Sequence, residues 1–245
     1  MSLTFIKSKH TVPLANMDSN CKFVIYGDKR LPHEIAHINE EIALNDASFF
    51  PSSYKEPRQN IRMFIAGSSG AGKSTFAAQF IKQLKTKGRQ FFIFSAVEED
   101  EPLDKLEPHR IDLDSDKLEA LDVDIFENSV VLFDDIDSHR DKNVVKFVQG
   151  LRDIMLERGR HKKIDVINVS HQVMNYRVTK GLLQESNMVT LFPKVDNRSV
   201  RKYLAEYQGF DRDEIKKAID LPSRWICLRN NVPKCLIHER GIYLI

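Results

Sequence analysis

Short runs of apolar residues recur along the middle of the chain and are separated by polar or amphipathic segments. Runs of this kind, bounded by turn-forming residues, are typical of buried strands in a parallel sheet. The sequence predicts five such strands, at residues 61–66, 91–95, 129–133, 164–169 and 188–192.

Two of the intervening segments carry apolar residues at helical spacing. The first set is Phe76, Ala77, Phe80, Ile81 and Leu84, and the second is Val144, Val145, Val148, Leu151 and Met155. We expect the second helix to begin at Asp141, a favourable N-cap residue, and to end at Gly159. Strands that alternate with helices predict an α/β fold with a central, mostly parallel sheet flanked by helices.

The two ends of the chain lack this alternation. Residues 1–60 show only short apolar bursts between turn formers, and we predict an N-terminal extension or small subdomain there. Residues 61–195 form the predicted core. Residues 196–245 are predicted to pack on it as two helices and two strand-like segments, at 200–207, 214–219, 225–228 and 235–238. Asp211 and Glu214 have the spacing of a capping box at the start of the second helix.

Composition limits the classes of function. With 37 Lys and Arg against 35 Asp and Glu, the formal charge is only +2, so any contact with DNA must be local. The three cysteines, Cys21, Cys227 and Cys235, form no CxxC pair and no closely spaced framework. We therefore expect a reducing compartment and neither a disulfide scaffold nor a zinc site.

The sequence contains no predicted membrane span or secretory signal. Its longest apolar runs, residues 91–94 and 130–133, are far shorter than the roughly 18 residues that a spanning helix needs. The first ten residues lack the apolar region of a signal peptide. The protein is therefore expected to remain in the compartment where it is made.

A glycine-rich segment links the first predicted strand to the first predicted helix. The spacing of Gly67, Gly72, Lys73 and Ser74 matches the Walker A pattern in the strand and helix context that this pattern requires. Glycines let backbone N–H groups turn inward onto a phosphate, and the helix start adds its positive dipole end. We therefore predict ATP binding by nine consecutive residues: Gly67, Ser68, Ser69, Gly70, Ala71, Gly72, Lys73, Ser74 and Thr75.

Two carboxylates directly follow the third predicted strand, and we interpret this segment as a Walker B motif. Lys73 would contact the β- and γ-phosphates, Ser74 and Asp134 would hold Mg²⁺, and Asp135 would polarise the attacking water. A strand that ends in a solvated acidic turn is the alternative. Because many P-loop ATPases carry glutamate where Asp135 stands, Glu98 or Glu99, just after the second predicted strand, is the alternative catalytic base.

A third polar element, Ser170-His171-Gln172, follows the fourth predicted strand. At that position a side chain can contact both the γ-phosphate and the attacking water, because ligands bind at the carboxyl ends of parallel strands. Gln172 or His171 is therefore a candidate for reporting hydrolysis to the rest of the domain. The alternative is a set of polar residues that caps the strand and opens a loop.

Taken in order, residues 67–75, 130–135 and 159–172 resemble the FtsK/HerA-type ATPases that package DNA into viral capsids. The likeness is strongest to the poxvirus-type packaging ATPases of large double-stranded DNA viruses and their virophages. It depends on the order of the motifs, since the phosphate loop alone occurs in many families. The resemblance spans about residues 60–195 and implies a P-loop NTPase of the additional-strand type, with N- and C-terminal extensions outside the match.

The resemblance also implies a function, that of a Mg-dependent ATPase which forms a ring, commonly a hexamer, and pumps double-stranded DNA into a viral capsid. The implied partners are double-stranded DNA, further copies of the chain, and capsid or portal proteins. The implied location is the cytoplasm of the infected host cell, at the virus factory, or the virion. Such rings place an arginine finger on the neighbouring subunit's γ-phosphate. Arg160 is the first candidate and Arg158 the second, in a basic turn that is otherwise a solvated connection.

Two other functions remain open. A P-loop small-molecule kinase would use the same loop, although the arginine-rich lid and acceptor site typical of such kinases are not recognisable. A nucleotide-gated DNA-binding scaffold would bind ATP without turnover, and the short side chain of Asp135 favours it. A phosphorylated small-molecule product would identify the kinase.

Overall fold

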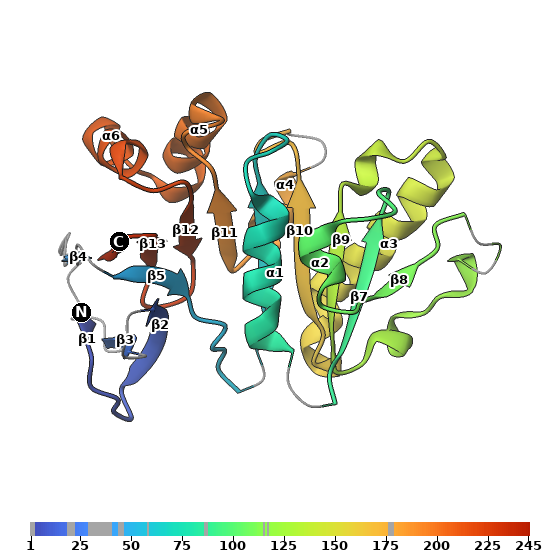
Figure 1. Cartoon of the computed structure of the whole chain (residues 1–245), viewed down its shortest axis with the longest axis horizontal. Coiled ribbons are helices and arrows are strands. Elements are labelled where there is room, and N and C mark those ends of the chain that lie inside the picture. Colours follow the sequence, from blue (N-terminus) through green and yellow to red (C-terminus); the bar gives the residue numbers. More distant parts are fainter. Residues whose placement is uncertain are drawn as a thin grey trace. The chain divides into compact units, whose positions relative to one another are not determined.

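The computed structural model of the 245-residue chain describes residues 3–18, 23–28, 41–43, 47–57, 59–85, 88–114, 116, 118–175 and 179–245, so Cys21 lies outside the described residues. The chain divides into two compact units, whose course Figure 1 traces. Unit 1 comprises Met1–Tyr54 and Asn187–Ile245, and unit 2 comprises Lys55–Ser186. The two ends of the chain thus share one unit, whereas the sequence-based ranges treated them separately and drew their boundaries at residues 60 and 195.

Unit 2 is built on five parallel strands in the order β6-β10-β9-β7-β8. They are β6 (Arg62–Ala66), β7 (Gln90–Ser95), β8 (His109–Ile111), β9 (Ser129–Asp134) and β10 (Asp165–Ser170). Strands β9 and β10 are buried along their whole length, as expected of central parallel strands covered on both faces. The predicted α/β fold with a mostly parallel sheet is confirmed.

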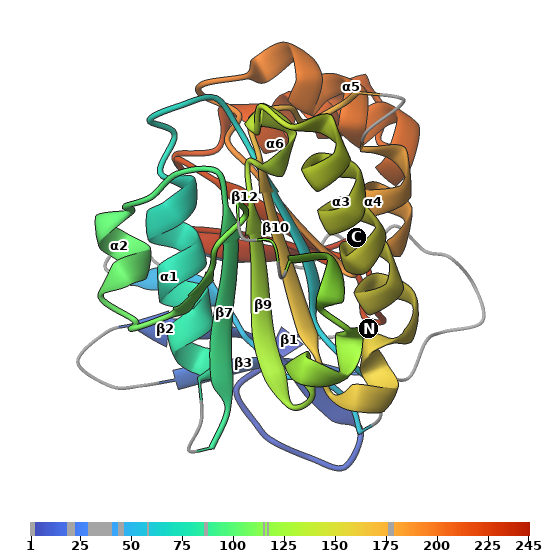
Figure 2. The ribbon, with the colours of Figure 1, turned by 90° about the vertical axis from the view of Figure 1, so that its right-hand side faces the viewer.

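Helices cover both faces of this sheet. They are α1 (Lys73–Leu84), α2 (Glu101–Asp104), α3 (Lys142–Arg158) and α4 (Lys180–Glu185), with four short 3-10 turns, η1 (Leu118–Ala120), η2 (Val123–Phe126), η3 (Ile136–Ser138) and η4 (Gly159–Lys162). Figure 2 shows α1 and α2 on one side of the strands and α3 and α4 on the other. The expected ends of α3 are confirmed, because Asp141 accepts a hydrogen bond from the backbone of Asn143 and Gly159 is the C-cap.

Unit 1 is antiparallel. One sheet has the order β1-β3-β2-β5, with β1 (Leu3–Thr4), β2 (Thr11–Asp18), β3 (Phe23–Asp28) and β5 (Ser48–Pro51). A second set pairs in the order β11, β12, β13, β14, β4: β11 (Met188–Leu191), β12 (Ile226–Arg229), β13 (Cys235–His238), β14 (Gly241–Leu244) and β4 (Glu41–Ala43). The predicted fifth strand is present as β11, but it pairs antiparallel with β12 and belongs to unit 1.

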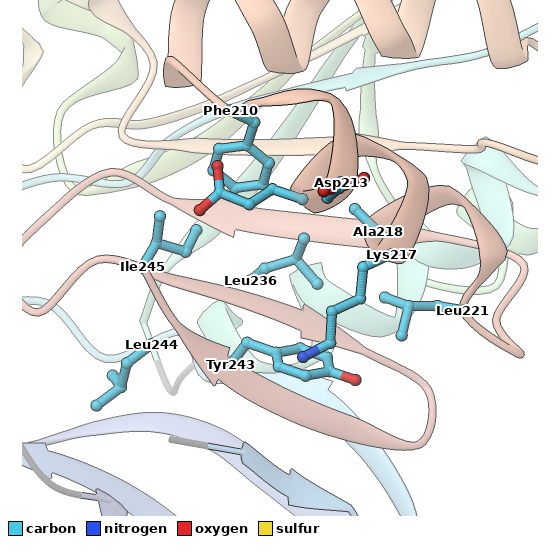
Figure 3. Close-up of a pocket in the computed structure, with 10 residues that line it drawn as sticks. Phe210, Asp213, Lys217, Ala218, Leu221, Leu236, Tyr243, Leu244 and Ile245 are labelled. Carbon is cyan, nitrogen blue, oxygen red and sulfur yellow. The ribbon is translucent and has the colours of Figure 1, made fainter. Parts of the chain in front are cut away.

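Two helices complete unit 1, α5 (Asn197–Gln208) and α6 (Arg212–Asp220). The predicted capping box at α6 is confirmed, since Asp211 and Glu214 exchange side-chain and backbone hydrogen bonds. A pocket of about 250 Å³ is lined by α6, β13 and β14, and within it the Lys217 ammonium lies 4.7 Å from the centre of the Tyr243 ring (Figure 3).

Cys227 and Cys235 are free thiols in the interior of unit 1. Burial raises the pKa of each thiol to about 12, so neither is a reactive thiolate near neutral pH. Within the described ranges, none of the helices combines the length and the hydropathy that crossing a membrane requires.

A buried carboxylate, Asp165, joins the amino ends of the strands in unit 2. Its side chain is inaccessible to solvent, and its oxygens accept hydrogen bonds of 2.7 Å from Lys55 Nζ, from an Arg89 guanidinium nitrogen and from the backbone N–H of Ile61. Arg89 also donates to the carbonyl of Ser129 at 2.7 Å. These contacts connect the residues at which β6, β7, β9 and β10 begin, and so hold the four strands in register.

Substitution of this carboxylate tests its structural role. Asp165→Asn leaves two cations without their shared counter-charge, and we expect the free energy of unfolding to fall by about 3–5 kcal/mol in urea denaturation. Asp124→Asn is the matched control, because it removes the exposed partner of Lys162 and should leave the midpoint unchanged. Equal midpoints for the two variants would show that Asp165 does not hold the sheet together.

Candidate nucleotide site

The carboxyl ends of four parallel strands meet at one edge of unit 2. In the strand register, Ser95 at the end of β7 lies beside Asp134 at the end of β9, and Asp134 lies beside Val169 on β10. Ser170, the next residue of β10, lies beside Ala66 at the end of β6. Polar residues that follow these strands are therefore gathered where α/β sheets bind ligands.

The glycine loop between β6 and α1 has the backbone geometry of a phosphate cradle. Gly67 N–H donates to the carbonyl of Ser170 at 3.2 Å, which ties the start of the loop to β10. Gly70 and Gly72 have φ values of 75° and 98°, in the region that favours glycine. Among the described residues no side chain caps α1 at Gly72, so the first amide groups of the helix are available to an anion.

A cleft of about 460 Å³ opens over this loop, within the size range of small-molecule sites. It brings Lys73, Ser74, Asp134 and Asp135 together, as their positions after β6 and β9 suggest. The cleft is lined by Ser69, Gly70, Gly72, Lys73, Ser74, Thr75, Val97, Asp100, Glu101, Pro102, Asp134, Asp135 and His171.

Lys73 is almost completely enclosed, with 8% of its surface exposed. Its ammonium donates to the carbonyl of Ser68 at 3.1 Å and lies 3.2 Å from Nδ1 of His171. Burial lowers the pKa of Lys73, and the charges of Asp134 and Asp135 oppose this shift. The lysine is thus held inside the loop by protein groups that an incoming phosphate would replace.

Asp134 is a desolvated carboxylate at the end of β9. Burial raises its pKa, and a hydrogen bond from Ser95 Oγ at 3.1 Å opposes the shift. The neighbouring carboxylates of Asp100 and Asp135 raise the pKa further, while Lys73 lowers it. A bound cation would favour the ionised form of this group.

Asp135 has an unusual backbone. Its φ of 47° lies in the left-handed region, which costs roughly 1–2 kcal/mol for most residues and is tolerated best by Gly, Asn and Asp. Its N–H donates to the carbonyl of Val169 at 3.3 Å, and its Oδ2 lies 3.3 Å from Nε2 of His171. Both Asp134 and Asp135 line the cleft, and at this turn the Asp135 carboxylate lies beside His171.

Of the nine predicted loop residues, Gly67, Ser68 and Ala71 are not among those that line the cleft, and three candidates from other segments also lie outside it. Gln172 is exposed, and its Oε1 accepts a hydrogen bond from Asn175 at 2.8 Å. Glu98 lines a neighbouring cleft together with His139. Arg160 is exposed in η4, before the amino end of β10, at the edge of the sheet opposite the glycine loop. Since β10 is six residues long, roughly 17 Å separates its two ends.

Sequence reasoning missed one side of the cleft. Asp100, Glu101 and Pro102 line it at the start of α2, and none of these three residues was a candidate from the sequence. Asp100 is the N-cap of α2, and its side chain accepts from the backbone of Leu103 at 3.3 Å. An Asp followed closely by Pro is a helix-start signal that could have located this turn.

Comparison with known proteins identifies a similar protein from a virophage. It is 32% identical to the uncharacterized protein V3 of Sputnik virophage over 219 residues, which cover 84% of this chain and 88% of V3. The chain belongs to the same protein family as virophage V3. No protein-family model matches the sequence.

Solved structures share the fold of this V3 relative. The genome packaging NTPase B204 from Sulfolobus turreted icosahedral virus 2, in complex with ATP-gammaS, is 14% identical with a TM-score of 0.50, covering 76% of this chain and 98% of B204. The pCW3 conjugation coupling protein TcpA is 11% identical with a TM-score of 0.53, covering 94% of this chain and 77% of TcpA. The predicted P-loop NTPase fold is thus confirmed, and the chain shares it with a viral genome packaging NTPase and a conjugation coupling protein.

The buried Asp134 carboxylate should lower the stability of the nucleotide-free V3 relative. Folding raises the pKa of this carboxyl, so the folded protein favours the protonated form. The stability gained in this way is complete below the unfolded pKa and is lost as pH rises through the folded pKa. We expect Asp134→Asn to raise Tm at pH 7 by roughly 1–4 °C and to leave Tm nearly unchanged near pH 3. Thermal scans at both pH values check this prediction, and a lower Tm at pH 7 would contradict it.

Proposed function

We propose that the chain is an ATP-driven motor that translocates double-stranded DNA into a viral capsid. The convergence of Lys73, Ser74, Asp134 and Asp135 on one cleft at the carboxyl edge of a parallel sheet carries the proposal. The virophage relative and the fold shared with a viral genome packaging NTPase support the biological setting, which is a virus-infected cell.

The glycine loop would wrap the phosphates of ATP. Lys73 leaves its contacts in the loop and donates to β- and γ-phosphate oxygens, while the amide groups at the start of α1 donate to the β-phosphate. Ser74 and Asp134 supply the oxygen donors that Mg²⁺ prefers, and the buried carboxylate of Asp134 fits a site where a cation replaces water as its partner. Mg²⁺ bound there would neutralise charge on the phosphates.

Asp135 is the proposed general base. It accepts a proton from the attacking water as the water oxygen bonds to the γ-phosphorus and ADP departs with the bridging oxygen. Its turned backbone places the carboxylate on the cleft wall beside His171. Glu98, the alternative base, lines the neighbouring cleft, so Asp135 is the better placed of the two.

The arginine finger is proposed to come from a neighbouring copy. Arg160 is exposed and lies at the sheet edge opposite its own cleft, so within one subunit it is far from the nucleotide. A ring, with six copies favoured, would deliver Arg160 across each interface, and its channel would hold the duplex. Capsid or portal proteins are the proposed docking partners of such a ring.

DNA dependence of the ATPase rate tests the proposed function. We expect duplex DNA to raise the rate of phosphate release, and we expect Lys73→Ala to abolish both nucleotide binding and turnover. ATP binding without turnover would identify the nucleotide-gated scaffold. A phosphorylated small-molecule product would identify a kinase, and a rate that ignores duplex DNA would exclude a DNA motor.

Mixing of two inactive variants tests the arginine finger. Arg160→Ala should keep ATP binding and reduce turnover by roughly 10³-fold or more, because charge on the transferring phosphoryl group loses its counter-charge. Rings that mix Arg160→Ala with Lys73→Ala subunits should regain activity, since some interfaces then combine an intact loop with an intact Arg160. No recovery would argue against a finger in trans, and Arg158→Ala is the comparison variant.

A further inference from the structure

His171 lies between two groups that are proposed to act on the nucleotide. It directly follows the last residue of β10 and lines the cleft. Its Nδ1 is 3.2 Å from the Lys73 ammonium, and its Nε2 is 3.3 Å from Oδ2 of Asp135. One imidazole ring thus contacts both the lysine of the phosphate loop and the proposed general base.

The two neighbours select one tautomer of the ring. A lysine ammonium has only donors, so Nδ1 of His171 must act as the acceptor toward Lys73. The ring proton of the neutral imidazole then lies on Nε2, which faces Oδ2 of Asp135 at 3.3 Å. The contacts therefore have a direction, from Lys73 through His171 to Asp135.

Occupancy of the phosphate loop would break the first of these contacts. In the present state Lys73 is held by the Ser68 carbonyl and by His171. A nucleotide must draw the ammonium toward its β- and γ-phosphates, which removes the donor from Nδ1. The contact between Nε2 and Asp135 does not need to change, because it is made by the other side of the ring.

We propose that His171 is a positioning residue with two separable roles: Nδ1 holds Lys73 while the loop is empty, and Nε2–H holds the Asp135 carboxylate for proton transfer. This inference rests on the proposed ATPase function and concerns the same cleft. The sequence left Gln172 and His171 as alternatives for reporting hydrolysis, and of the two only His171 lines the cleft. The Gln172 side chain, by contrast, is occupied by Asn175 and does not line the cleft.

Two substitutions separate the roles. In His171→Asn the side-chain carbonyl lies near the place of Nδ1 and can still accept from Lys73, but nothing reaches Asp135. In His171→Gln the amide N–H lies near the place of Nε2 and can still donate to Asp135, while the acceptor for Lys73 is lost. His10→Ala, in the turn before β2 of unit 1, is the control for loss of a histidine elsewhere.

The two variants should change different constants. We expect His171→Asn to lower kcat about 10–100-fold with the Kd for ATP-gammaS and Mg²⁺ unchanged, since a general base without its orienting partner is misplaced. We expect His171→Gln to keep kcat within about threefold and to lower that Kd about 3–10-fold, because Lys73 loses a competing partner. His10→Ala should alter neither constant, and thermal scans confirm that each variant is folded.

The pattern of results decides between the alternatives. Parallel losses of kcat and affinity in both His171 variants would mean that the residue only supports the fold of the cleft, and would overturn the proposal. A wild-type protein that binds ATP-gammaS but never hydrolyses ATP would instead overturn the proposed function. In that case the Kd comparison alone would decide whether His171 holds Lys73.

Discussion

The geometry of the cleft depends on a carboxylate at the other end of the sheet. Asp165, buried at the start of β10, collects hydrogen bonds from the residues that precede β6 and β7, and its partner Arg89 reaches the first residue of β9. Each residue of a strand advances about 3.3 Å, and a slip by one residue exchanges the two faces of the sheet. The alignment of the strands at Asp165 therefore also fixes which residues lie side by side at their carboxyl ends. There, Asp134 and His171 must lie next to the glycine loop.

The groups of the cleft are held in states that are costly without a ligand. Asp134 is desolvated beside two other carboxylates, and Lys73 is buried with protein partners in place of phosphates. Desolvated groups of this kind concentrate at functional sites, where rigid surroundings maintain them. In this chain the parallel sheet supplies those surroundings, and a nucleotide with its cation would relieve the charge imbalance.

The sequence was most informative where a local pattern is compatible with only one kind of local structure. Glycine spacing located the phosphate loop, and unbroken apolar runs located the strands that become β9 and β10. Which polar residue faces the nucleotide could not be read from the order Ser170-His171-Gln172, because a hydrogen bond between Gln172 and Asn175 turns that amide elsewhere. The lysine and arginine around Asp165 are distant in sequence, so no periodicity could have shown their convergence.

The same limit applied to the ends of the chain. Residues 1–60 show no clear periodicity, yet β5 within them hydrogen-bonds to Glu239 through the backbone of Phe49 at 3.0 Å. Antiparallel pairing between distant segments leaves only weak local signals, since each strand is short and its partner lies far along the chain. The clustering of both ends into one unit thus required the three-dimensional structure.

We propose that this nucleotide cleft works between copies of the chain around a DNA duplex. The decisive measurement is the mass of the assembly in the presence of ATP-gammaS, Mg²⁺ and duplex DNA. We expect a closed ring, with six copies favoured, that contains one duplex. A single copy under every nucleotide condition, with the duplex free in solution, would contradict it.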